Sequence, residues 1–235
     1  MNYHADSRTS RWAPGTRYAY NSIEPATAAY IVEGITGKKY ENYVKENFFA
    51  PLGMKSTTFY KTSDYDKYGA VLYNANGTPE KYNFSQYRPS GSINSSTKEM
   101  ANLLQFFIQR GEFAGQKILD TKSIDCMEKP TSTLGNALGI TSGYGLNNMT
   151  KGFENFGYDF HGHDGGGLGS FSELMYSPSL GEGYVILINS SNGSGWQISQ
   201  LVMNYLLRNA QKKNTPSIPL GNKLSEMSGL YVQLN

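Results

Sequence analysis

The spacing of apolar residues changes near Gly143 from a helical period to a strand-like one. Before it, apolar residues recur every three or four positions and predict helices over 25–34, 39–49 and 121–127. After it, short apolar runs predict strands over 144–146, 159–163, 170–176 and 183–189, with a helix over 196–209. Helices followed by an antiparallel meander and one more helix indicate an α+β fold, because a parallel sheet would need strands and helices to alternate.

Turn and cap signals divide the chain further. Ser96-Thr97-Lys98-Glu99 has the spacing of a capping box and predicts a helix that ends at Gly111. Gly181-Glu182-Gly183 predicts a hairpin between the last two strands, and the polar stretch 60–94 predicts a long surface excursion. We expect one incomplete domain over 1–210, a linker over 211–223 and the start of a truncated segment over 224–235.

Charge and cysteine content exclude several classes of protein. The 21 Lys and Arg residues are scattered among 19 Asp and Glu, so the chain lacks the basic stripe of a nucleic-acid binder. No apolar run approaches the roughly 20 residues of a spanning helix, so we expect no transmembrane segment. Cys126 is the only cysteine, which excludes an intrachain disulfide and a zinc site built from several cysteines.

A glycine-rich stretch over 160–171 contains two histidines. Its three consecutive glycines are typical of a loop between strands, and they would also let a ligand approach the backbone closely. His161 and His163 alternate, so on a strand both would point to one face, which is compatible with a metal site. Because the only other histidine is His4, we expect neither a metal nor another cofactor here.

Several motifs, in the same order, resemble the serine β-lactamase-related family, which includes class C β-lactamases, DD-peptidases, esterases and small amide hydrolases. They are the segments Pro14–Ser22, Phe49–Met54, Ser96-Thr97, Tyr144-Gly145-Leu146 and Gly162–Gly166. The resemblance implies an antiparallel sheet within residues 144–190, backed by the 196–209 helix. A mainly helical lobe over 25–130 would lie beside the sheet, and the amino-terminal part of the fold would be missing.

By this resemblance, Tyr20 and His163 are the catalytic candidates: Tyr20 would move a proton, and His163 would stand where the family has Lys or His. Ser22, Asp164, Gly165 and Gly166 are candidates for substrate and oxyanion contacts, with Ser22 replacing the family's Asn. A phenol is a useful base near neutral pH only beside a cation that lowers its pKa from about 10. We therefore expect the side chains of Tyr20 and His163 to lie within about 10 Å of each other in one cleft.

The family's nucleophile is the serine of a Ser-x-x-Lys motif, and its position is the largest departure. The only such motif here, Ser95 to Lys98, follows Tyr20 instead of preceding it and falls on a predicted helix cap. We therefore expect a fragment that lacks its nucleophile and is inactive alone.

The resemblance implies acyl transfer on a small-molecule ester, amide, β-lactam or peptidoglycan-like peptide, and a periplasmic or extracytoplasmic location. The alternatives are a non-catalytic binding or sensor homologue and, less favoured, a His-based metallohydrolase. Strand edges left exposed by the missing part could be covered in a homodimer.

Overall fold

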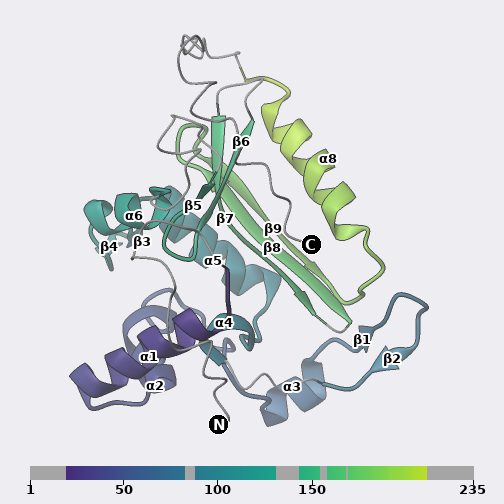
Figure 1. The fold of residues 1–235 in the computed structure, drawn as a ribbon, viewed down its shortest axis with the longest axis horizontal. Coiled ribbons are helices and arrows are strands. Elements are labelled where there is room, and N and C mark those ends of the chain that lie inside the picture. Colours follow the sequence, from purple (N-terminus) through teal and green to yellow (C-terminus); the bar gives the residue numbers. More distant parts are fainter. Residues whose placement is uncertain (1–19, 83–87, 131–142, 154–157, 168, 211–235) are drawn as a thin grey trace, which may run out of the picture.

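The computed structural model describes residues 20–82, 88–130, 143–153, 158–167 and 169–210. A group of helices occupies one end of the molecule, and a twisted sheet with a long helix beside it occupies the other (Figure 1). The helices are α1 (Ile23–Thr36), α2 (Tyr40–Val44) with a π-helical turn (Lys45–Phe49), α3 (Ser63–Tyr68), α4 (Arg88–Gly91), α5 (Thr97–Ile108), α6 (Thr121–Glu128) and α8 (Gly195–Leu207).

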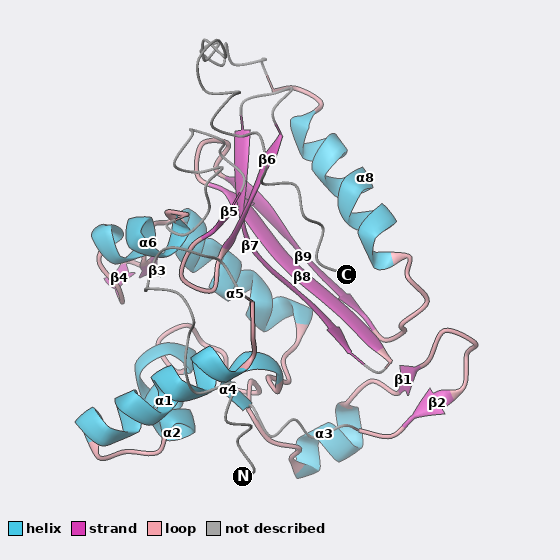
Figure 2. Cartoon of the chain, viewed as in Figure 1, coloured by secondary structure: helices cyan, strands magenta, loops and turns pink. Residues whose placement is uncertain are grey.

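The main sheet is an antiparallel meander of five strands in the order β5-β6-β7-β8-β9. These strands are β5 (Gly143–Tyr144), β6 (Met149–Phe153), β7 (Tyr158–Gly167), β8 (Ser170–Ser177) and β9 (Glu182–Ile188). Two short hairpins lie outside it, formed by β1 (Leu72–Tyr73) with β2 (Pro79–Glu80) and by β3 (Glu112–Phe113) with β4 (Gln116–Lys117). The α+β fold predicted from the sequence is therefore confirmed (Figure 2).

Helices cover both faces of the sheet. One face packs against α8, where Phe160, Met175 and Tyr184 meet Met203 and Leu207 in a buried cluster. The other face lies against α5, which crosses β8 and β9. A second buried cluster joins α5 and α6 to the helical lobe; it consists of Phe49, Leu52, Met54, Phe59, Phe106 and Ile124. Helices α5 and α8 thus bury apolar residues in these clusters, whereas Ile31 and Ile35 of α1, which the helical spacing would place on a buried stripe, are exposed.

The predicted capping box over 96–99 is only half present. Ser96 caps α5 as predicted, since its hydroxyl accepts the backbone N–H of Glu99 at 3.3 Å. The Glu99 carboxylate does not return to Ser96; it accepts the Ser56 N–H at 2.9 Å and the Thr57 hydroxyl at 2.6 Å. Glu99 therefore anchors α5 to the turn that follows the π-helical segment.

Three further details differ from the predictions. The glycines at 165–167 lie within β7 and pair with β8, so they form no loop. The turn before β9 ends at Gly181 (φ 69°), and Glu182 and Gly183 already belong to the strand. The 60–94 stretch contains helices and the β1–β2 hairpin, and the hairpin is tied to the end of β9 by the Tyr73 N–H, which donates to the carbonyl of Asn189 at 3.0 Å.

Some predictions fall outside the described residues. They are the 211–223 linker, the 224–235 segment and the first part of the Pro14–Ser22 motif. Within the described ranges, no helix has both the length and the apolar content needed to cross a membrane.

Candidate active site

Tyr20, Tyr144 and His163 form an aromatic cluster from three separate segments. Tyr20 lies three residues before the start of α1, Tyr144 ends β5, and His163 lies in β7. The ring centroid of Tyr20 is 6.0 Å from that of His163 and 5.9 Å from that of Tyr144. The predicted approach of Tyr20 and His163 is therefore confirmed, while the catalytic role of each remains a proposal.

His163 is held through both of its ring nitrogens. Its Nε2 lies 2.7 Å from the Tyr144 hydroxyl, and its Nδ1 contacts the backbone carbonyl of Asp164. The Asp164 carboxylate lies at the limit of an ion pair, 4.0 Å from Nδ1. Sequence reasoning assigned Tyr144 no role, although Tyr144-Gly145-Leu146 was one of the motifs that carried the family resemblance.

Asn21, the residue after Tyr20, caps the start of α1. The Asn21 side chain accepts the backbone N–H groups of Ile23 at 2.8 Å and Glu24 at 3.0 Å. Its amide also donates to the Glu24 carboxylate at 3.0 Å. Ser22 makes no side-chain capping bond, so Asn21 satisfies the free donors at this helix end and fixes the chain next to Tyr20.

One edge of β7 is unpaired beyond Gly162 in the described part of the sheet. There β6 pairs with β7 only as far as Gly162, whereas β8 continues to Gly167. The Gly162 N–H points to the β6 side, because it donates to the Asn148 side chain at 2.9 Å. Since backbone groups alternate along a strand, the Gly166 N–H points to this same side, as an oxyanion donor requires.

Glycine is required at Gly162 itself. Its φ of 151° lies in a region that side chains rarely adopt, and a Cβ there would stand 1.9 Å from the Leu174 carbonyl oxygen. At Gly166, by contrast, a Cβ would meet nothing within 4 Å. The glycines of β7 therefore allow a close strand contact at Gly162 and leave open space at Gly166.

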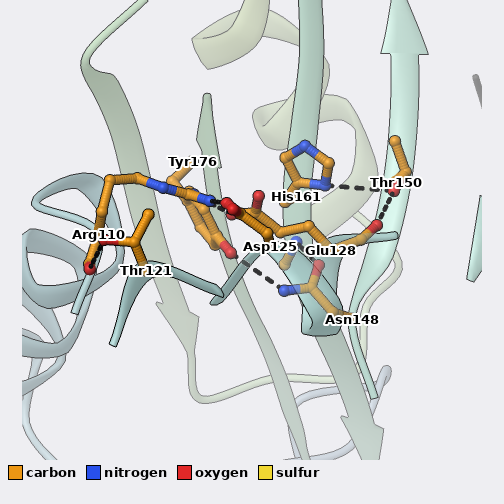
Figure 3. A network of polar contacts seen from close by, with 9 residues as sticks. Arg110, Thr121, Asp125, Glu128, Asn148, Thr150, His161 and Tyr176 are labelled. Carbon is orange, nitrogen blue, oxygen red and sulfur yellow. Dashed lines mark hydrogen bonds and ion pairs between the residues drawn. The ribbon is translucent and has the colours of Figure 1, made fainter. Parts of the chain in front are cut away.

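His161 belongs to a different environment from His163. Its Nδ1 lies 3.2 Å from the Thr150 hydroxyl, within a polar network that includes Arg110 paired with Asp125 and Glu128 (Figure 3). Burial lowers the pKa of His161, against the opposing effect of nearby carboxylates such as Glu128. The two histidines thus have separate hydrogen-bond partners, and the described residues contain no group of three or more His, Cys, Asp or Glu side chains suited to a metal ion.

An apolar cavity of about 270 Å³ borders His163 on the side of α5. Leu103 and Phe107 of α5 line it together with Leu174 of β8. A group that reached His163 from this side would therefore meet a mainly hydrocarbon wall.

Ser95 belongs to the only Ser-x-x-Lys motif, and its side chain takes part in the contacts that anchor α5. Its hydroxyl lies 2.8 Å from that of Thr57, which donates in turn to Glu99. These contacts lie next to the Ser96 cap, and they join Ser95 to none of the three aromatic residues of the cluster.

Comparison with known proteins gives these motifs a context. Residues 6–199 match the Beta-lactamase family. The chain is 31% identical over 147 residues to PbpX of Bacillus subtilis (strain 168), a candidate penicillin-binding protein; the match covers 60% of this chain and 36% of PbpX. It is 25% identical to the octameric penicillin-binding protein homologue from Pyrococcus abyssi, with a TM-score of 0.70 over 92% of this chain and 48% of that one.

A class C β-lactamase shares the fold at 14% identity, with a TM-score of 0.68 over 90% of this chain and 62% of that one. The chain spans about a third of the length of PbpX and about half that of the Pyrococcus abyssi protein. Because the family match extends over residues 6–199, most of the sequence, the chain belongs to the Beta-lactamase family.

Proposed function

We propose that the chain carries the proton-transfer and oxyanion side of a serine hydrolase site, which acts by acyl transfer on an ester, amide or β-lactam carbonyl. The observation that carries the proposal is the 6.0 Å separation of the Tyr20 and His163 rings, which come from segments far apart in the sequence. A domain that needed only a stable core would have no chemical use for a tyrosine and a histidine facing each other at an open strand edge.

Each residue has a role that its chemistry allows. Tyr20 carries the proton between the nucleophile and the leaving group, and His163 in its protonated form supplies the positive charge that favours phenolate. The Gly166 N–H stabilises the oxyanion from the free edge of β7. Asp164 and Gly165 hold that edge in place, and Ser22 lies at the start of α1 beside Tyr20, where a substrate could reach it.

The nucleophile would come from sequence outside the described cluster. Acyl transfer needs an activated serine, and the Ser95 hydroxyl is engaged with Thr57. The chain alone is therefore expected to have no meaningful turnover. The likeness to proteins named as penicillin-binding proteins supports a carbonyl compound as the substrate class.

The test is to assay the purified chain on a p-nitrophenyl ester and a chromogenic cephalosporin, with Ser95→Ala beside it. We expect no turnover above buffer from either protein. Turnover that disappears in Ser95→Ala would make Ser95 the nucleophile, and turnover that persists would reveal another one; both outcomes overturn the assignment made here.

A second candidate, a binding or sensor homologue, is favoured by the engagement of the Ser95 hydroxyl with Thr57. The genomic sequence upstream of Met1 separates the two functions. An open frame that carries Ser-x-x-Lys supports the hydrolase, whereas a true start at Met1 supports the binding protein.

A further inference from the structure

Tyr144 is held in a fixed position beside His163. Its strand pairs with β6 through Tyr144 and Met149, and the Gly145 N–H donates to the Asn148 carbonyl at 2.7 Å to close the turn between them. A Cβ on Gly145 would stand 2.1 Å from the carbonyl oxygen of Met127, so the turn lies tightly against the end of α6. The Tyr144 ring is edge-on to His163, with 5.7 Å between the centroids.

The partners of His163 determine where its protons lie. A backbone carbonyl can only accept, so the Nδ1 that faces Asp164 must carry a hydrogen. In the neutral ring Nε2 is then an acceptor, and the Tyr144 hydroxyl, 2.7 Å away, must donate to it. In the protonated ring both nitrogens donate, and the Tyr144 oxygen becomes the acceptor.

We propose that Tyr144 is a positioning residue that holds the His163 imidazole in one orientation in both protonation states and selects the Nδ1–H tautomer of the neutral ring. The direction of the Tyr144–His163 hydrogen bond reverses when His163 takes up a proton, while the ring stays in place. The consequence for catalysis rests on the proposed function: the charge of His163 would always appear at the same point beside Tyr20.

Tyr144 also has a purely structural interpretation, in which its ring fills space between Tyr20 and His163. The two interpretations differ in whether the Tyr144 hydroxyl is needed. Tyr144→Phe keeps the ring and its edge-on contacts and removes only the group that bonds to Nε2. If the ring alone matters, the nitrogen signals of His163 do not respond to this substitution.

The experiment is nitrogen NMR of the full chain labelled with ¹⁵N-histidine, at a pH of about 8.5, where an ordinary imidazole is neutral. The sequence has three histidines, and His161→Gln and His163→Gln assign their signals. We expect the wild-type His163 to show a protonated Nδ1 and an Nε2 shifted by accepting a hydrogen bond. In Tyr144→Phe the Nε2 signal should move to the position of a nitrogen without a protein donor.

His161 supplies a matched control on the same strand. Thr150→Val removes the hydroxyl next to its Nδ1 and should move the His161 signals only, whereas Tyr144→Phe should move those of His163 only. A wild-type His163 protonated at Nε2, or His163 signals unmoved in Tyr144→Phe, would overturn the proposal. If Tyr144→Phe fails to fold, the tautomer of His163 in the wild type still tests the proposal. None of these readouts requires turnover, so failure here is distinct from failure of the proposed function.

Discussion

Asn148 accepts the backbone N–H of Gly162 at 2.9 Å, one residue before His163 in β7. The same side chain donates to the Tyr176 hydroxyl at 3.1 Å, so it joins β7 to β8 from the turn that follows β5 (Figure 3). Asn148 is 3% exposed, and water cannot readily replace either bond. At the end of the β6–β7 pairing, the Asn148 side chain therefore accepts the strand N–H of Gly162. Beyond this point β7 continues as the open edge of the site.

Asn148→Ala should destabilise the chain substantially, because it leaves the Gly162 N–H and the Tyr176 hydroxyl without this partner in a buried environment. Each such group costs roughly 1–3 kcal/mol. Urea unfolding followed by circular dichroism measures the loss. The exposed Asn204→Ala on α8 is the control and should stay within about 0.5 kcal/mol of the wild type. Equal losses in the two variants would show that Asn148 does not hold β7.

Glu99→Ala should cost more stability than Ser96→Ala. The serine cap contributes about 1 kcal/mol. The Glu99 carboxylate binds both the Ser56 N–H and the Thr57 hydroxyl, and bonds to a charged group contribute roughly 1.5–3 kcal/mol each. Thermal unfolding of both variants provides the comparison. The reverse order would mean that the bonds of the Glu99 carboxylate contribute less to stability than the Ser96 cap.

The contrast between Ser96 and Glu99 shows what a local pattern can predict. The hydroxyl three residues before a backbone N–H finds its partner within one helical turn, so spacing alone predicts that bond. The partners of Glu99 lie on Ser56 and Thr57, across a turn whose approach depends on tertiary packing. Strand β6 escaped prediction for a related reason. Its sequence, Met-Thr-Lys-Gly-Phe, lacks a regular apolar alternation, and it forms because β5 and β7 pair with it.

The candidate site likewise combines contacts that the sequence predicts with contacts that depend on tertiary packing. The family motifs predicted that Tyr20 and His163 would meet, because each motif serves the same reacting carbonyl. The sequence could not predict the bond from Tyr144 to His163, because the distance between them depends on the β5–β6 turn and on the register of β6 with β7. The cap of α1 by Asn21 was not predicted either, because Asn21 and Ser22 are neighbouring polar residues and the spacing does not decide which of them caps the helix.

Acidification should destabilise the chain partly through His161. Burial lowers the pKa of His161 in the folded chain, against the opposing effects of Glu128 and Asp159, and Arg110 adds to the lowering. The unfolded chain therefore binds a proton first, near pH 6.5. The stability contributed by the neutral ring is complete above that pH and is lost as the pH falls toward the folded pKa.

The measurement is the free energy of unfolding in urea, from about pH 8 to about pH 5, for the wild type and His161→Gln. The variant should lose less stability over this range, since glutamine does not titrate. Parallel pH curves would show that His161 has the same proton affinity in both states.

The ion pair of Lys151 and Glu173 provides the sharpest stability test on the other face of the sheet. Lys151 Nζ lies 2.5 Å from a Glu173 oxygen, the glutamate side chain is fully buried, and the Tyr184 hydroxyl donates to its second oxygen at 3.2 Å. Lys151→Met should cost roughly 3–5 kcal/mol, because it leaves a buried carboxylate without its cation. Lys151→Met combined with Glu173→Leu should recover much of this loss, since a buried pair can often be replaced by apolar side chains. A double-mutant cycle in urea measures the coupling, and a loss below about 1 kcal/mol in Lys151→Met would show that water, rather than Lys151, solvates Glu173.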